Sequence, residues 1–205
     1  VFTTSWGGDL DTLVRQSGQR GLLQRSTFIL AIGESSIQRL GKDLPEGLIV
    51  GARGDHWFLH PEKKGDAAFK AFNEAFKAKT GAWPIYPVYH MAQAFAALQT
   101  AYDKAIKANG GNWPTREQVV DATAGIEFAT GFGRPVTLRP EDNQGLEAQL
   151  VGVTKTVPGY DFKLLDNMML FDPKVITNPA GVRSVEWLKT LKPEFVKMDV
   201  PTFKQ

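Results

Sequence analysis

The chain has 205 residues, 42% of them hydrophobic, which is enough for a buried core in one domain or two small ones. Its 24 basic and 22 acidic residues are scattered along the sequence, so no dense basic face indicates binding to nucleic acid or to an anionic membrane. The absence of cysteine excludes disulfides, thiolate chemistry, iron–sulfur clusters and cysteine-ligated zinc.

The first quarter of the sequence predicts a parallel β-α-β unit. Residues 1–5 favour a strand, and a helical stripe follows, with Asp9 as the expected N-cap and Gly21 as the stop signal. Residues 27–32 predict the next strand and residues 48–52 a further short one. A parallel sheet this small cannot be covered on both faces, so we expect additional strands upstream.

The central stretch, residues 66–109, predicts two amphipathic helices joined at a short hinge, residues 81–84. Apolar side chains recur in both helices at intervals of three and four, on an alanine-rich background in the second. Two such stripes need a partner surface, and we expect the flanking strands to supply it. The stripes consist of Phe69, Phe72 and Phe76 in the first helix and Phe95, Leu98, Tyr102 and Ile106 in the second.

The last part of the sequence predicts a capped helix followed by strands. Thr115 and Gln118 have capping-box spacing, which starts a helix extending to about residue 124. Residues 134–138 favour a strand, and residues 149–157 and 162–171 favour the two strands of a hairpin. A short terminal helix carrying Val185, Leu188 and Leu191 follows the loop at 178–181.

Sequence motifs for catalysis and metal binding are weak or missing. His56 and His60 have the spacing of a zinc motif, but the intervening glutamate is lacking and Gly54 disfavours a helix. His90 is expected to be a packed or capping residue, and Glu141 belongs to a solvated turn. No nucleophile elbow or Walker loop is present. We therefore expect no catalytic residues, no metal site and no cofactor.

Two loops remain as candidate ligand contacts, because each follows the carboxyl end of a strand in the parallel unit. Ligands bind at this end of open α/β sheets, where helix N-termini and free backbone N–H groups converge. The first loop offers Trp6 for stacking, with Gly7, Gly8 and Asp9 after it. The second, Gly33–Ser36, offers a charge and two hydroxyls. The alternative is that Trp6 plugs the core and the second loop is an ordinary helix cap.

With these loops in place, the chain resembles the later half of a periplasmic solute-binding protein of branched-chain amino acid type, the receptor component of ABC importers. The resemblance covers nearly the whole chain through the order and spacing of its motifs. They are residues 1–9 with Trp6-Gly7-Gly8-Asp9, Arg20-Gly21-Leu22, Pro45-Glu46-Gly47-Leu48, Phe72 to Gly81 followed by Pro84 and Tyr89, Gly133-Arg134-Pro135-Val136, and the closing hairpin.

The resemblance implies an α/β protein with a partial type I periplasmic-binding-protein fold, in which pieces of two Rossmann-like lobes are linked at a hinge. Residues 1–47 would belong to the second lobe, residues 48–140 to the first, helix-rich lobe, and residues 141–205 would return to the second. The first part of the first lobe would precede Val1, together with a signal peptide that is removed or absent.

The resemblance also implies roles for individual residues. The aromatic residue after the first strand packs against the ligand in this family, and Trp6 falls on that position. An acidic residue after the next strand pairs with the ligand's ammonium group; Glu34 is the nearest acid, whereas a strict match puts Ile32 there. The expected ligand-binding residues are therefore Trp6, Gly7, Gly8, Asp9, Ile32, Gly33, Glu34 and Ser35.

The expected function is a non-enzymatic, periplasmic solute-binding receptor of an ABC importer. Its ligand would be a small amino acid or an aromatic or aliphatic carboxylate held between the lobes, and its partner would be the importer's membrane permease. The register at Ile32 leaves both ligand classes open. The alternative is a ligand-sensing regulatory domain of the same fold, and a third possibility is an α/β enzyme, which the missing nucleophile and base disfavour.

Overall fold

A computed structural model describes residues 1–54, 66–131 and 133–204. The chain divides into two compact units. Unit 1 comprises Val1–Tyr86, Gln149–Phe171 and Val200–Gln205, and unit 2 comprises Pro87–Ala148 and Asp172–Asp199. The assignment of residues 1–47, 48–140 and 141–205 to two receptor lobes stays a prediction, because a compact unit of this chain need not be a lobe of a receptor.

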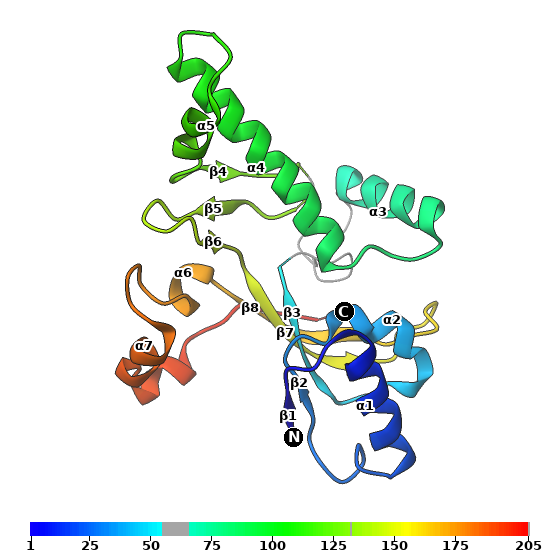
Figure 1. The fold of residues 1–205 in the computed structure, drawn as a ribbon. Helices are drawn as coiled ribbons and strands as arrows, with labels where there is room; N and C mark the ends of the chain where they lie inside the picture. Colours follow the sequence, from blue (N-terminus) through cyan, green and yellow to red (C-terminus); the bar gives the residue numbers. More distant parts are fainter. Residues whose placement is uncertain (55–65, 132, 205) are drawn as a thin grey trace. The chain divides into compact units, whose positions relative to one another are not determined.

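Unit 1 is built from a mixed sheet with helices beside it (Figure 1). In chain order its elements are β1 (Phe2–Thr3), α1 (Gly7–Gln19), β2 (Ile29–Leu30), the 3-10 turn η1 (Glu34–Ser36), α2 (Ile37–Leu40), the 3-10 turn η2 (Gly41–Asp43), β3 (Ile49–Arg53), α3 (Ala67–Thr80), β7 (Gln149–Lys155), β8 (Leu164–Phe171) and β9 (Thr202–Phe203).

The sheet of unit 1 combines a parallel and an antiparallel part. In the described residues its strand order is β1-β2-β3-β7-β8-β9, with β1, β2 and β3 parallel to one another. β7 joins β3 in antiparallel orientation and forms a hairpin with β8, and β9 pairs with β8. The predicted parallel β-α-β unit and the predicted hairpin are confirmed, although β1 and β2 are shorter than the sequence indicated.

The core of unit 1 gathers apolar side chains from α1, the strands and α2. Leu10 and Val14 of α1 are completely buried, as their helical spacing predicts. The prediction that Asp9 caps this helix is wrong, because Gly7 and Gly8 are themselves helical and Trp6 occupies the N-cap position. The core cluster consists of Leu10, Val14, Leu23, Phe28, Leu30, Ile37, Leu40, Leu44, Leu48, Val50, Ala52, Leu150, Phe162, Leu164, Leu165 and Met168.

Unit 2 contains a second, antiparallel sheet with the order β4-β5-β6 among the described residues. Its elements are α4 (Tyr86–Ala108), whose first residue belongs to unit 1, α5 (Arg116–Ala122), β4 (Glu127–Phe128), β5 (Val136–Leu138), β6 (Gly145–Leu146), α6 (Pro173–Ile176), α7 (Ser184–Thr190) and the 3-10 turn η4 (Pro193–Lys197). The predicted capping box of Thr115 and Gln118 is confirmed at the start of α5.

The core of unit 2 corrects one prediction about α4. This helix buries its alanine side, with Ala101 and Ala105 packed against α5 and the strands. Phe95 and Leu98 are 67% and 50% exposed, so the expectation that flanking strands cover this stripe is wrong for these two residues. Small side chains allow the helix to approach its neighbours closely, whereas a bulky stripe needs a wider surface.

Candidate functional site

The register of the parallel strands brings the predicted loops to one edge of the sheet. Thr3 is level with Leu30, and Leu30 is level with Val50. Trp6, Gly33 and Arg53 each come three residues after one of these paired positions. Neighbouring strands lie about 4.8 Å apart, so the three segments end side by side at the carboxyl ends of β1, β2 and β3. We call this the carboxyl edge.

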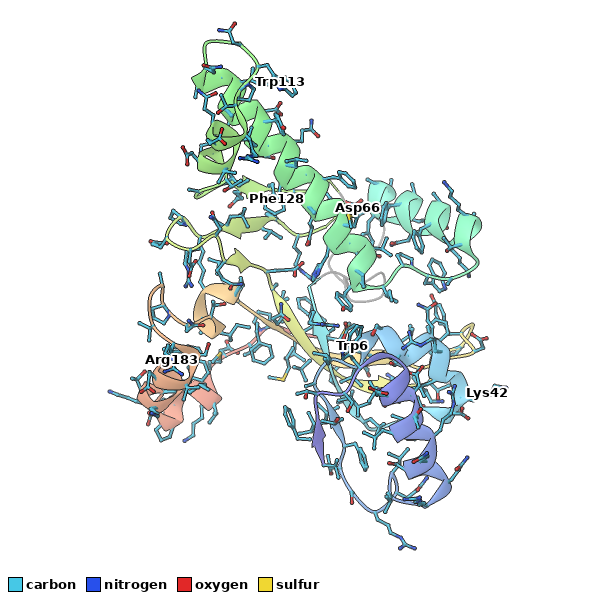
Figure 2. The ribbon with its side chains drawn as sticks, viewed as in Figure 1. Trp6, Lys42, Asp66, Trp113, Phe128 and Arg183 are labelled. Carbon is cyan, nitrogen blue, oxygen red and sulfur yellow. The ribbon has the colours of Figure 1, made fainter. Side chains whose placement is uncertain are left out.

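The first loop presents an exposed aromatic ring at the start of a helix. Trp6 has an extended backbone at the N-cap of α1 and is 59% exposed (Figure 2). This exposure does not fit the alternative in which Trp6 plugs the core. Gly7 has a φ of +59°, a conformation that favours glycine, and neither Gly7 nor Gly8 has another group within 4 Å of the place of a Cβ atom. The backbone here is therefore open to close approach, and Asp9 lies exposed in the first helical turn.

The second loop is buried more deeply than its polar sequence suggests. Glu34, Ser35 and Ser36 form η1 and are 1%, 5% and 0% exposed, whereas Ile32 is half-buried. A Cβ atom on Gly33 would lie 2.9 Å from the Cβ of Leu30 and 3.2 Å from Cγ1 of Val50, so only glycine fits without a shift of these side chains. The tight turn holds the segment against the core of unit 1.

The buried carboxylate of Glu34 faces a cation from the next strand. Arg53 ends β3, and its Nη2 donates to Oε1 of Glu34 over 3.4 Å. The Glu34 side chain is 0% exposed and the Arg53 side chain 30% exposed. The Arg53 guanidinium also lies over the ring of Tyr86, 3.7 Å from its centroid, which is a cation–π geometry. A charge pair and an aromatic ring therefore stand at the carboxyl edge beside the two loops.

A second arginine, which the sequence analysis missed, connects helix α1 to the second loop. The Nε atom of Arg39 donates to Oδ2 of Asp11 in α1 over 2.8 Å, and its Nη1 donates to the carbonyl of Ser35 over 2.7 Å. Its Nη2 donates to Oγ of Ser36 over 2.9 Å. Asp11 is only 7% exposed. An acid beside the buried stripe of Leu10 and Val14 requires a charged partner, and that was the signal available in the sequence.

The other ionisable candidates lie away from this edge or outside the described residues. His56 and His60 fall outside the residues that the structure describes. His90 has its Nε2 atom 2.9 Å from Oε2 of Glu147 in unit 2, and its side chain is 38% exposed. Hydrogen bonds from Thr156 lower the pKa of Glu46, which precedes β3 and so lies at the opposite edge of the sheet.

Two searches of the described residues concern metals and membranes. Within residues 1–54, 66–131 and 133–204, no group of three or more histidine, aspartate or glutamate side chains could hold a metal ion. Over the same ranges, the search for a helix with the length and apolar character needed to cross a bilayer found none.

A family model described as "Periplasmic binding protein" matches residues 1–154, which include the whole carboxyl edge. The chain belongs to the periplasmic binding protein family. A search of curated proteins gave no match. Solved structures share the fold of this family member, which has the mixed α/β, partial type I periplasmic-binding-protein fold that its sequence predicted.

The chain spans less than half the length of each of three similar solved structures. The amino acid ABC transporter substrate-binding protein of Pseudomonas fluorescens Pf-5 matches 88% of this family member and 44% of its own chain, with 20% identity and a TM-score of 0.58. A solute-binding protein of Rhodopseudomonas palustris BisB5, in complex with 3,4-dihydroxybenzoic acid, matches 88% of this family member and 46% of its own chain, with 20% identity and a TM-score of 0.55. The Brucella ovis leucine-, isoleucine-, valine-, threonine- and alanine-binding protein matches 87% of this family member and 44% of its own chain, with 21% identity and a TM-score of 0.56.

Proposed function

We propose that the chain is the ligand-binding part of an extracytoplasmic solute-binding receptor that serves an ABC importer. The observation that carries this proposal is the convergence of three strand ends at the carboxyl edge, where Trp6 is exposed beside an open glycine backbone. Family membership supports it, because the solved relatives include substrate-binding proteins of ABC transporters. The proposed ligand is a small amino acid or an organic carboxylate.

The eight predicted residues remain proposed members of the site, with different degrees of access and with a changed role for Glu34. Trp6 would stack on the ligand, and the backbone of Gly7 and Gly8 would approach it closely. Asp9 is exposed and Ile32 half-exposed, so both can reach a small molecule. The remaining three residues are buried and would act without touching the ligand. Gly33 and Ser35 would shape the second loop, and Glu34 would hold the side chain of Arg53.

The receptor would work by closure and not by catalysis. In the proposed arrangement, parts of the chain belong to two lobes, with residues 1–47 and 141–205 in one and residues 48–140 in the other. A ligand stabilises the closed form only by as much as it binds that form better than the open one. The closed receptor would then be the form that the membrane permease recognises in the periplasm.

The test is a thermal-shift screen of the full-length protein against amino acids, aromatic acids and dicarboxylates. A ligand present at 100 times its dissociation constant stabilises the folded state by about 2.7 kcal/mol. That corresponds to a rise in the melting temperature of roughly 5–10 °C for a chain of this size. Hits are then titrated by calorimetry, and the bound compound is recovered for mass spectrometry. No shift with any compound would contradict the receptor, and chemically altered ligand would indicate an enzyme.

A further inference from the structure

The carboxyl edge carries a positive charge that the family match does not explain. Arg53 is the last residue of β3, at the same end of the parallel strands as Trp6 and Gly33, which follow β1 and β2. Its side chain is 30% exposed, so the side chain is partly accessible to solvent or to a ligand. A cation at the strand ends, beside an aromatic ring, suits an anionic ligand with an apolar body.

The described contacts of Arg53 leave most of its donors unused. A guanidinium has five N–H donors, of which one makes a described hydrogen bond, the long contact of 3.4 Å to Glu34. The Tyr86 ring, 3.7 Å from the guanidinium, holds its plane without using an N–H group. The Nε atom is buried and has no hydrogen-bond partner among residues 1–54, 66–131 and 133–204. A buried N–H group without a partner costs free energy, so an acceptor oxygen from a ligand that reached it would be bound favourably.

The nearby acids are poorly placed for a ligand ammonium. Glu34 is fully buried and already faces Arg53, so an ammonium that approached it would also meet the positive guanidinium. Asp9 is exposed in the first turn of α1, where its charge is screened by water. Within the pair, the Arg53 side chain is 30% exposed and the Glu34 side chain 0% exposed, so an approaching ion meets the cation first, which favours a carboxylate over an ammonium.

We propose that Arg53 is the anchor for the ligand's carboxylate, so that the ligand class is an organic carboxylate whose recognition needs no ammonium group. This inference rests on the proposed receptor function and names the ligand class of the same site. Glu34 and Tyr86 are positioning residues, which hold the guanidinium with its free donors available. Trp6 contacts the apolar or aromatic body of the same ligand.

The test compares matched ligands on the full-length protein by calorimetry at neutral pH. One set is isocaproate, its neutral amide and leucine, which share a skeleton; the other is p-hydroxybenzoate and its amide. We expect at least one acid to bind about tenfold to a hundredfold more tightly than its amide, because a charge-assisted pair is lost. We expect leucine to bind no more tightly than isocaproate. Equal affinity for acids and amides, or a tenfold preference for leucine, would overturn the inference.

Variants of Arg53 show whether the preference for acids over amides depends on this residue. Arg53→Gln should remove the preference for acids by weakening acid binding more than amide binding, and Arg53→Lys should keep part of the preference, since the charge remains. Arg116→Gln is the matched control, because this arginine is 88% exposed in unit 2 and should leave every affinity as in the parent. An acid preference that survives in a folded Arg53→Gln protein contradicts the proposal. If neither Arg53 variant folds, the ligand series on the parent protein decides.

The outcomes separate this inference from the function on which it rests. Binding that requires the ammonium group keeps the receptor and removes only the carboxylate class. Binding of a neutral amide from the matched sets, with no response to any acid, does the same. No binding of any compound in the screen removes both.

Discussion

The carbonyl oxygen of Ala31 lies 2.1 Å from the position that a Cβ atom on Gly51 would occupy, so β2 and β3 approach each other without room for a side chain. This approach comes two residues before Arg53 and one residue after the pairing of Leu30 with Val50. It therefore sets the spacing of two of the three segments that form the carboxyl edge.

Replacing Gly51 should destabilise unit 1. Gly51→Ala is expected to lower the free energy of unfolding by about 3 kcal/mol, the upper end of the usual cost of overpacking, because backbone and not a flexible side chain must move. Urea denaturation checks this. Gly145→Ala is the matched control, since the nearest atoms to its Cβ lie at 4.0 Å. Equal stability of Gly51→Ala and the parent would mean that the strands can separate freely.

Removing the exposed ring at the first loop should weaken ligand binding and leave stability unchanged. Trp6→Ala is expected to cost about 1–3 kcal/mol of binding free energy, or roughly 5-fold to 150-fold in the dissociation constant. The side chain is 59% exposed, so little packing is lost. Calorimetry with the best ligand from the screen measures the change. Trp113→Ala, which removes a tryptophan that is 75% exposed in unit 2, serves as the control. An unchanged affinity in Trp6→Ala would remove Trp6 from the site.

The pair of Glu34 and Arg53 should be coupled in stability. Glu34→Gln is expected to lower the free energy of unfolding by about 1–3 kcal/mol, because a buried carboxylate that faces a guanidinium is replaced by a neutral amide. A double-mutant cycle with Arg53→Gln should give a coupling energy of about 0.5–3 kcal/mol. Additive effects of the two substitutions would show that the contact of 3.4 Å contributes nothing.

The fold was predictable where the sequence pattern is local. The stripe of α1 and the hairpin of β7 and β8 were recognised because turn residues and apolar periods act over a few positions. Gly7 and Gly8 were expected before the helix but are its first residues. The failure at Phe95 and Leu98 has the opposite cause. Their spacing indicates one apolar face of α4, but Ala101 and Ala105 mark the face that packs, and only tertiary structure decides between the two.

The sequence predicted the position of the candidate site in the sheet, but it did not predict the contacts among the residues of the site. The rule that ligands bind at the carboxyl ends of parallel strands predicts a site at Trp6 and Gly33, and the parallel pairing of β1 with β2 brings the segments after both strands to the same end of the sheet. The burial of Glu34 could not be inferred, since its loop sequence is polar throughout. Arg39 and Arg53 were missed because their partners are 28 and 19 residues away in the chain, beyond the reach of any local spacing rule.

The hydrogen bonds of Arg39 should stabilise the second loop. Arg39→Met removes donors to Asp11, Ser35 and Ser36 and leaves the buried carboxylate of Asp11 without its cation. We expect a loss of about 1–3 kcal/mol of stability and weaker ligand binding. The comparison is Arg15→Met, which removes an ion pair whose side chains are 45% and 56% exposed and should cost less than about 1 kcal/mol. Equal losses in the two variants would show that Arg39 has no special role.

The turn at Glu141 and Asp142 should contribute stability that depends on pH. Arg139 donates from Nε to Oδ1 of Asp142 over 2.9 Å, and from Nη1 to the carbonyl of Asn178 over 2.6 Å. The hydrogen bonds from Arg139, and one from the backbone of Gln144, lower the pKa of Asp142 below its usual value. A carboxylate with a lowered folded pKa stabilises the protein above its unfolded pKa of about 3.9. That contribution is lost as the pH falls through the folded pKa.

Asp142→Asn tests this, because the amide imitates the protonated acid at every pH. We expect the parent to be more stable than Asp142→Asn at neutral pH, with a difference that shrinks as the pH falls below about 4. Urea denaturation across the pH range measures the difference directly. Glu141→Gln removes a neighbouring negative charge but none of the described hydrogen bonds of Arg139, so it should show a smaller pH-dependent difference. A constant difference between the parent and Asp142→Asn at all pH values would mean that the ionised form of Asp142 is not the stabilising one.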